Sequence, residues 1–294
     1  MIATSPRGRG VLEILLGTVF ISFSAVFVKL AHVGPTAAGV YRNLFGALAL
    51  LLLTAVRRET LWRGVTPVFY AVLAGVFFAT DIFCWHRSIL YIGPGLATIM
   101  GNFQVFVMAL VGIAVFRERA TGRFLLSLPL AVVGLFLLVG FRWGDLDASY
   151  RAGLALGLAT ALTYAGYLLT LRRSQRAATR LEAVPNLALV TTVTAAILWI
   201  VAMALGEPLR IPDGQTWLVL VAYGVLCQAL GWIVISRGLR TVEASRAGLL
   251  LLLQPALTFV WDITFFGRPT TLLEALGAAL AIGAIYMGMG SARR

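Results

Sequence analysis

The chain has 294 residues and a formal net charge of +12; 60% of its residues are hydrophobic and only 12% are charged. Soluble domains carry about 25% charged residues, so an aqueous fold could not bury this much apolar surface and a soluble domain is excluded. The basic residues are dispersed through short connections and form no nucleic-acid-binding motif, which excludes nucleic acid and favours the lipid bilayer as the partner.

Ten apolar segments are long enough to cross the hydrocarbon core, which takes about 20 residues per helix. Their nearly uniform apolar character predicts an all-α integral membrane protein with ten transmembrane helices. The first segment follows two arginines like a signal peptide, but it is long enough to span the membrane and is predicted to be retained. The predicted spans are residues 11–31, 35–56, 66–89, 94–116, 121–141, 151–171, 185–205, 214–236, 244–266 and 271–290.

The arginines predict the orientation of these helices, because cytoplasmic loops are enriched in lysine and arginine. If the N-terminus is cytoplasmic, only four of the 24 basic residues fall in outside loops, namely Arg142, Arg151, Arg210 and Arg268. Lys29, Arg42 and Arg87 lie within helices or at their ends, and all the others fall inside. Both termini are therefore predicted to be cytoplasmic, in a multi-pass protein of the bacterial inner (plasma) membrane.

The two halves of the sequence share landmarks 150 positions apart. The matched pairs are Arg87 with Arg237, Gln104 with Gln254, Phe116 with Phe266, and Thr121 with Thr271. This spacing predicts two repeats, residues 1–146 and 147–294, with five helices in each. Because five is odd, the second repeat would enter the membrane from the opposite side, and inverted repeats typically enclose a central site that opens to either face by alternating access.

Three segments resemble the drug/metabolite transporter superfamily, specifically its ten-helix EamA-type exporters. They are GTVFISFSAVFVKLAHVGPTAAGVYRNLFGALALLLL, WHRSILYIGPGLATIMGNFQVFVMALVGIAVFRERAT and ISRGLRTVEASRAGLLLLLQPALTFVWDITFFGRPTT. Within that family the chain looks closest to exporters of aromatic amino acids. The resemblance implies a secondary transporter that exports small metabolites, amino acids above all, with no catalytic residue, cofactor or metal. It leaves the oligomeric state open, with a monomer as one option.

Asp81 is the deepest carboxylate of the first half, and ionisable groups inside a span are functional candidates because they are costly there. At helical spacing it shares a face with Trp85, and His86 lies beside that face. These residues could form a cavity wall that binds an ammonium group or carries a proton. The alternative is a structural Asp81 held by Arg87 or by a backbone hydroxyl. Glu13, barely one turn into its helix, is predicted to be an interface residue.

Further candidates are polar or aromatic side chains on the fourth, sixth, eighth and ninth helices. Pro255 is expected to break the ninth helix and to leave a free carbonyl near Leu251. Each of the others has a structural alternative as a packing residue or a partner in an interhelical hydrogen bond. The remaining candidates for substrate binding are Asn102, Tyr164, Tyr167, Gln228, Trp232 and Gln254.

Two other functions compete with amino-acid export. An exchanger of organic phosphates or nucleotide sugars would need several cationic groups at one site, and only Lys29, Arg42 and Arg87 are available. An intramembrane lipid-modifying enzyme is disfavoured because the sequence contains no HExxH, GxSxG or glycine-rich phosphate motif. The two cysteines lie inside predicted spans and indicate neither a disulfide nor a metal site.

Overall fold

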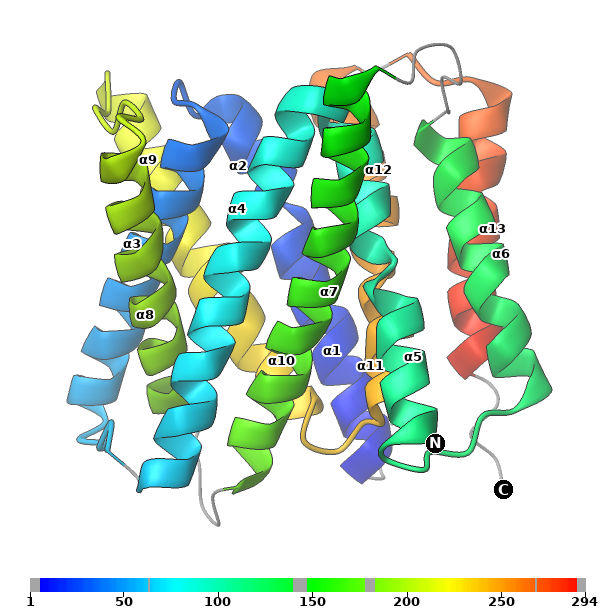
Figure 1. The fold of residues 1–294 in the computed structure, drawn as a ribbon, viewed down its shortest axis with the longest axis horizontal. Helices are drawn as coiled ribbons and strands as arrows, with labels where there is room; N and C mark the ends of the chain where they lie inside the picture. The colour runs from blue at the N-terminus through cyan, green and yellow to red at the C-terminus, as the bar shows by residue number, and fades with distance from the viewer. Residues whose placement is uncertain (1–5, 63, 140–146, 178–182, 268, 290–294) are drawn as a thin grey trace. The chain divides into compact units, whose positions relative to one another are not determined.

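A computed structural model describes residues 6–62, 64–139, 147–177, 183–267 and 269–289, and all regular structure within them is helical (Figure 1). Eight helical stretches of these residues are long and apolar enough to span a membrane. Two shorter apolar helices, Gly122–Leu137 and Leu272–Gly288, fall where the fifth and tenth spans are predicted. The prediction of an all-α membrane protein is confirmed.

The first half of the chain holds α1 (Pro6–Ser22), α2 (Ser24–Leu30), α3 (Pro35–Val56), α4 (Val65–Asn102), α5 (Gln104–Ala114) and α6 (Gly122–Val139). The second half holds α7 (Ala148–Ala177), α8 (Ala183–Ala204), α9 (Gly214–Ala222), the π-helix η1 (Tyr223–Gly231), α10 (Trp232–Gly238), α11 (Ala244–Leu251), α12 (Leu253–Phe266) and α13 (Leu272–Met289).

The third and fourth predicted spans correspond to two apolar stretches of the described residues, Val65–Ile92 and Ala97–Ala114. The connection expected between residues 89 and 94 is not a loop, because the helical backbone of α4 continues from Val65 to Asn102. Gly93, Pro94 and Gly95 are typical turn residues, which is why the sequence suggests a break there. A continuous helix keeps most backbone groups hydrogen-bonded, and this matters more in lipid, where no water can replace a lost bond.

Two predicted spans are interrupted by single residues. Leu252 separates α11 from α12, and Pro255 follows in the first turn of α12, where its missing N–H leaves no lost bond. Phe103 separates α4 from α5 at nearly the matching position of the first half. Gln104 and Gln254 occupy matching positions of the two halves in the sequence. Both thus follow a helix interruption.

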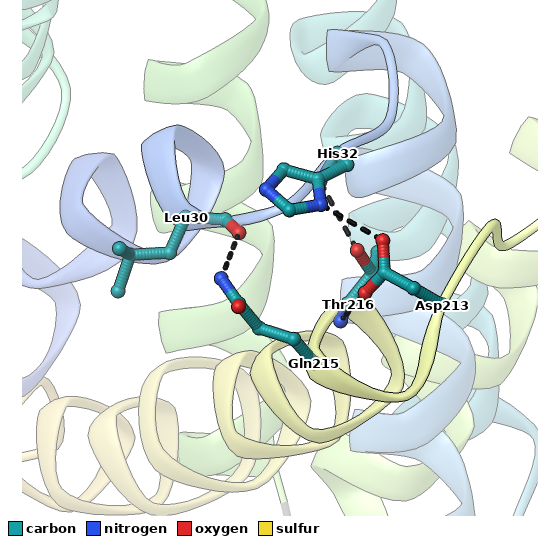
Figure 2. Close-up of polar contacts among 5 residues, drawn as sticks. All are labelled: Leu30, His32, Asp213, Gln215 and Thr216. Atoms are coloured by element: carbon teal, nitrogen blue, oxygen red, sulfur yellow. Dashed lines mark hydrogen bonds and ion pairs between the residues drawn. The ribbon is translucent and has the colours of Figure 1, made fainter.

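The α9 N-terminus is capped and tied to the connection between α2 and α3. The Asp213 carboxylate accepts a hydrogen bond of 2.7 Å from the Thr216 backbone N–H, which satisfies one of the open donors at the helix start. Its other oxygen lies 2.8 Å from Nδ1 of His32 (Figure 2). The His32 backbone N–H donates to the Thr216 hydroxyl, and the Gln215 amide donates to the Leu30 carbonyl.

The chain divides into two compact units, and each combines segments from both halves of the sequence. The first unit comprises residues 1–83 and 166–241, and the second comprises residues 84–165 and 242–294. These units are not the predicted repeats, residues 1–146 and 147–294, which stay a prediction.

Close packing in the first unit joins α3 to α8 and η1, and α1 to α10 and η1. Glycine makes these approaches possible. A Cβ atom on Gly17 of α1 would lie 2.5 Å from the Ile235 side chain and 2.7 Å from the Gly231 carbonyl. Small residues at such contacts are typical of membrane helices, whose association depends on close van der Waals packing.

In the second unit, α6 runs beside α13 and α5 packs against α11 (Figure 1). The turn after α5 carries Glu118, which caps the α11 N-terminus. Its carboxylate accepts bonds of 2.7 Å from the Ala244 N–H, 3.0 Å from the Ser245 N–H and 2.7 Å from the Ser245 hydroxyl. The cap satisfies two open backbone donors and places a negative charge at the positive end of the helix.

Candidate functional site

Arg42, eight residues into α3, is the centre of a buried polar cluster in the first unit. Its Nε donates a 2.9 Å hydrogen bond to the Gln228 side-chain oxygen. Its Nη1 donates a 3.2 Å hydrogen bond to the Tyr223 hydroxyl. Both acceptors come from η1, so one helix holds the guanidinium from one side. A cation inside a membrane span is costly unless such partners stabilise it.

The π-helical geometry of η1 explains how Tyr223 and Gln228 reach the same guanidinium. In an α-helix of 3.6 residues per turn, residues five apart point about 140° away from each other. In a π-helix the backbone bonds join residues five apart, so their side chains become neighbours. The wider turn of η1 therefore brings Tyr223 and Gln228 to one side. Such segments occur frequently at functional sites.

Two glycines let α3 approach η1 closely enough for these bonds. A Cβ atom on Gly46 would lie 2.5 Å from Cγ of Gln228, and one on Gly224 would lie 2.8 Å from the Gly46 backbone nitrogen. The Gln228 amide is also fixed from the far side, because its Nε2 donates to the Thr191 hydroxyl of α8 at 3.3 Å. Its oxygen is thereby directed toward Arg42.

Three aromatic rings pack beside the guanidinium. Phe78 of α4 stacks on Tyr167 of α7 with ring centroids 4.3 Å apart, and Trp232 of α10 lies edge-on to both, at 5.6 Å and 4.8 Å. The Arg42 Cζ lies 5.7 Å from the centre of the Phe78 ring and 5.2 Å from that of Tyr223. Both distances are within the range of cation–π attraction. We call Phe78, Tyr167 and Trp232 the aromatic trio.

Asp81 lies one turn beyond Phe78 on α4 and is only 8% exposed. The positive charge of Arg42 acts on its carboxyl group. No hydrogen bond or ion pair joins Asp81 to another side chain in the part of the chain that the structure describes. A buried carboxylate without a direct partner is costly, so this group either holds a proton or awaits a cation.

Four predicted site residues, Asp81, Tyr167, Gln228 and Trp232, meet around Arg42 in the first unit. Trp85, His86, Asn102, Tyr164 and Gln254 belong to the second unit, and their role in substrate binding stays a prediction. The Trp85 ring lies 5.2 Å from that of His86, which is buried. Asn102 donates to the Thr98 carbonyl of its own helix at 2.8 Å, an intrahelical bond that needs no substrate.

Sequence reasoning missed the central role of Arg42 and the contributions of Tyr223 and Thr191. The sequence does point to Arg42, because inserting an arginine within a membrane span costs roughly 2.5–3.5 kcal/mol of free energy on insertion scales. Such a residue therefore needs a polar partner. Tyr223 gave no such signal, since regular α-helical spacing places it away from Gln228. The cation that acts on Asp81 is Arg42 of α3.

Comparisons with known proteins agree over nearly the whole chain. The EamA-like transporter family matches it twice, over residues 8–140 and 151–289. Two uncharacterized transporters, from Synechocystis sp. and Archaeoglobus fulgidus, are each 24% identical and match 95% of this chain, with 92% and 95% of their own lengths covered. A crystal structure that is 20% identical covers 97% of this chain and 99% of its own, with a TM-score of 0.82, which shows likeness of fold.

The family matches cover both halves of a chain whose described helices are apolar enough to span a membrane. The related proteins of similar length are transporters and not enzymes. This chain belongs to the EamA-like transporter family of the drug/metabolite transporter superfamily and is a multi-pass membrane transporter.

Proposed function

We propose that this transporter exports small metabolites, chiefly amino acids including aromatic ones, by alternating access. The observation that carries the proposal is the placement of a partly buried guanidinium and a buried carboxyl group beside the aromatic trio within one unit. Aromatic faces suit an apolar or aromatic side chain, and a few fixed polar groups give orientation. The resemblance to exporters of aromatic amino acids supports the same substrate class.

The site is less suited to an organic phosphate or a nucleotide sugar. Such polyanions are usually bound by several cationic groups, because each phosphate brings more than one negative charge. In the described part of the first unit, Arg42 is the cation that lies over a ring of the aromatic trio. Asp81 places a carboxyl group nearby, which would repel a polyanion unless it were protonated.

We also propose that the two halves of the chain are inverted repeats around a central cavity, in the inner membrane of a bacterial cell with both termini cytoplasmic. The repeated landmarks and the arginine asymmetry support this arrangement. The two helix interruptions at Phe103 and Leu252 agree with the repeat. The π-helix η1 has no counterpart in α4, so the halves have diverged at the candidate site.

The test is transport by purified protein in proteoliposomes with a panel of radiolabelled amino acids, with and without a pH gradient. We expect flux of aromatic and other apolar amino acids, and a dependence on the gradient if export is coupled to protons. Flux of organic phosphates without flux of any amino acid would contradict the proposal and favour the exchanger.

Two carboxylate variants sharpen this test. Asp81→Asn keeps the side-chain volume and removes the charge, and we expect amino-acid flux to fall at least about tenfold, equivalent to roughly 1.4 kcal/mol on the limiting step. Glu13→Gln should leave most flux intact, because Glu13 lies 3.4 Å from Arg9 in an i,i+4 pair near the helix end. Normal flux and pH dependence in a well-expressed Asp81→Asn protein would return Asp81 to a structural role.

A further inference from the structure

Arg42 and Asp81 lie beside the same aromatic trio, yet no hydrogen bond or ion pair joins the guanidinium to the carboxyl group. If both charges served only stability, direct pairing would be expected, because it removes the cost of burying each charge alone. Instead, Gln228 and Tyr223 hold the guanidinium, and no described side chain forms a hydrogen bond or ion pair with the carboxyl group. The first unit thus leaves the guanidinium and the carboxyl group without a direct bond to each other.

The guanidinium of Arg42 retains donors for a ligand. Of its five N–H groups, one on Nε and one on Nη1 donate to side chains of η1, and no described residue accepts from Nη2. The Phe78 and Tyr223 rings lie near the guanidinium. A ligand would therefore approach the edge of the guanidinium that carries the remaining N–H groups. An Arg edge with two terminal nitrogens binds a carboxylate with two parallel hydrogen bonds.

Asp81 offers the complementary chemistry. An ionised carboxylate is an acceptor only, and an ammonium group is a donor only, so the two satisfy each other. At 8% exposure, Asp81 has little water to replace such a partner. The carboxyl group lies on the same helix as Phe78, one turn away, so a cation bound there would lie beside the aromatic trio.

We propose that Arg42 and Asp81 lie at the two ends of one binding site for a zwitterionic α-amino acid. Arg42 binds the carboxylate of this ligand, and Asp81 binds its ammonium group. This inference rests on the proposed function and adds how the substrate is recognised. A simple amine would leave Arg42 without a counter-charge, and a simple carboxylate would do the same to Asp81. A net-neutral ligand with both groups matches a pair of opposite charges that are held apart.

The test is binding of three probes to purified protein in nanodiscs, measured by competition with radiolabelled phenylalanine. The probes are phenylalanine, phenethylamine, which lacks the carboxylate, and 3-phenylpropionate, which lacks the ammonium group. The wild-type protein should bind phenylalanine at least about tenfold more tightly than either analogue. Equal binding of phenylalanine and either analogue would overturn the inference, whatever the variants do.

The variants should give a crossed pattern. Arg42→Gln should lose the preference for phenylalanine over phenethylamine and keep its preference over 3-phenylpropionate, and Asp81→Asn should do the reverse. Arg42→Lys keeps the charge but loses the two-pronged geometry, and should fall between the wild type and Arg42→Gln. Glu13→Gln is the control and should behave like the wild type.

The outcomes separate the two proposals. If the wild type binds and transports no amino acid, the proposed function fails. If it transports phenylalanine, but Arg42→Gln and Asp81→Asn weaken the binding of all three probes equally, the proposed function stands. The proposal that Arg42 and Asp81 bind the two charged groups of the ligand would then be wrong. A purely structural role would produce that uniform loss, because misplaced helices do not distinguish a missing carboxylate from a missing ammonium group.

Discussion

Gly224→Ala tests whether the close approach of α3 and η1 holds the Arg42 cluster together. A Cβ atom at this position would lie 2.6 Å from Cβ of Phe45, 2.8 Å from the backbone nitrogen of Gly46 and 3.0 Å from the carbonyl oxygen of Arg42. Two of these three atoms belong to the backbone and cannot move by rotation of a side chain. The two helices must therefore separate to admit the methyl group.

The expected cost follows from opposing effects. Overpacking of this kind costs about 1–3 kcal/mol, and the better helix propensity of alanine returns up to about 1 kcal/mol. We expect a net destabilisation of about 1–2 kcal/mol. Separation of the helices should also lengthen the 2.9 Å bond between Arg42 and Gln228, so amino-acid flux should fall along with stability.

The buried thiols of Cys84 and Cys227 provide the assay, because neither forms a disulfide and both become reactive toward a fluorogenic maleimide when the protein unfolds. Gly283→Ala is the matched control: nothing lies within 4 Å of a Cβ atom on Gly283, so the same substitution should be neutral or stabilising. If Gly224→Ala unfolds at the same temperature as Gly283→Ala, the close packing of α3 on η1 does not carry the stability assigned to it.

Three further predictions concern other parts of the molecule. Glu118→Ala should destabilise the second unit by about 1–3 kcal/mol, because the Ser245 N–H loses its acceptor. Glu118→Gln keeps an acceptor oxygen and should be destabilised less. For both variants, the temperature at which the buried thiols become reactive measures the loss of stability. Hydrogen bonds from the Thr216 backbone and from His32 lower the pKa of Asp213 to about 2, so its cap stabilises α9 fully above the unfolded pKa of about 4 and is lost as the pH falls toward 2. The melting-temperature difference between the wild type and Asp213→Asn should therefore persist at pH 5 and shrink below pH 4; an undiminished difference down to pH 2.5 would contradict this. Single cysteines at Asp147 and Asp213 should react with an impermeant thiol reagent from outside the cell, and one at Arg58 should not; the reverse pattern would invert the topology.

The sequence alone was sufficient for the fold class, because segments of about 20 residues that are almost uniformly apolar cross lipid as helices. It also predicted Asp81, Gln228 and Trp232 as candidate site residues, since polar and indole groups inside a span must find partners and therefore stand out against leucine and valine. These conclusions depend on composition and on the cost of polar groups in hydrocarbon, and neither requires knowledge of which helices touch.

Only the tertiary structure decided how the site is assembled. Arg42 becomes its centre because α3 meets η1 at Gly46 and Gly224, a contact between residues far apart in the chain. Tyr223 joins it because η1 adopts π-helical spacing, whereas sequence reasoning assumed 3.6 residues per turn. The sequence likewise placed a loop between residues 89 and 94, where α4 stays helical. In each case local preferences differ by little, and packing against other helices, together with the need to satisfy every backbone group in lipid, determines the result.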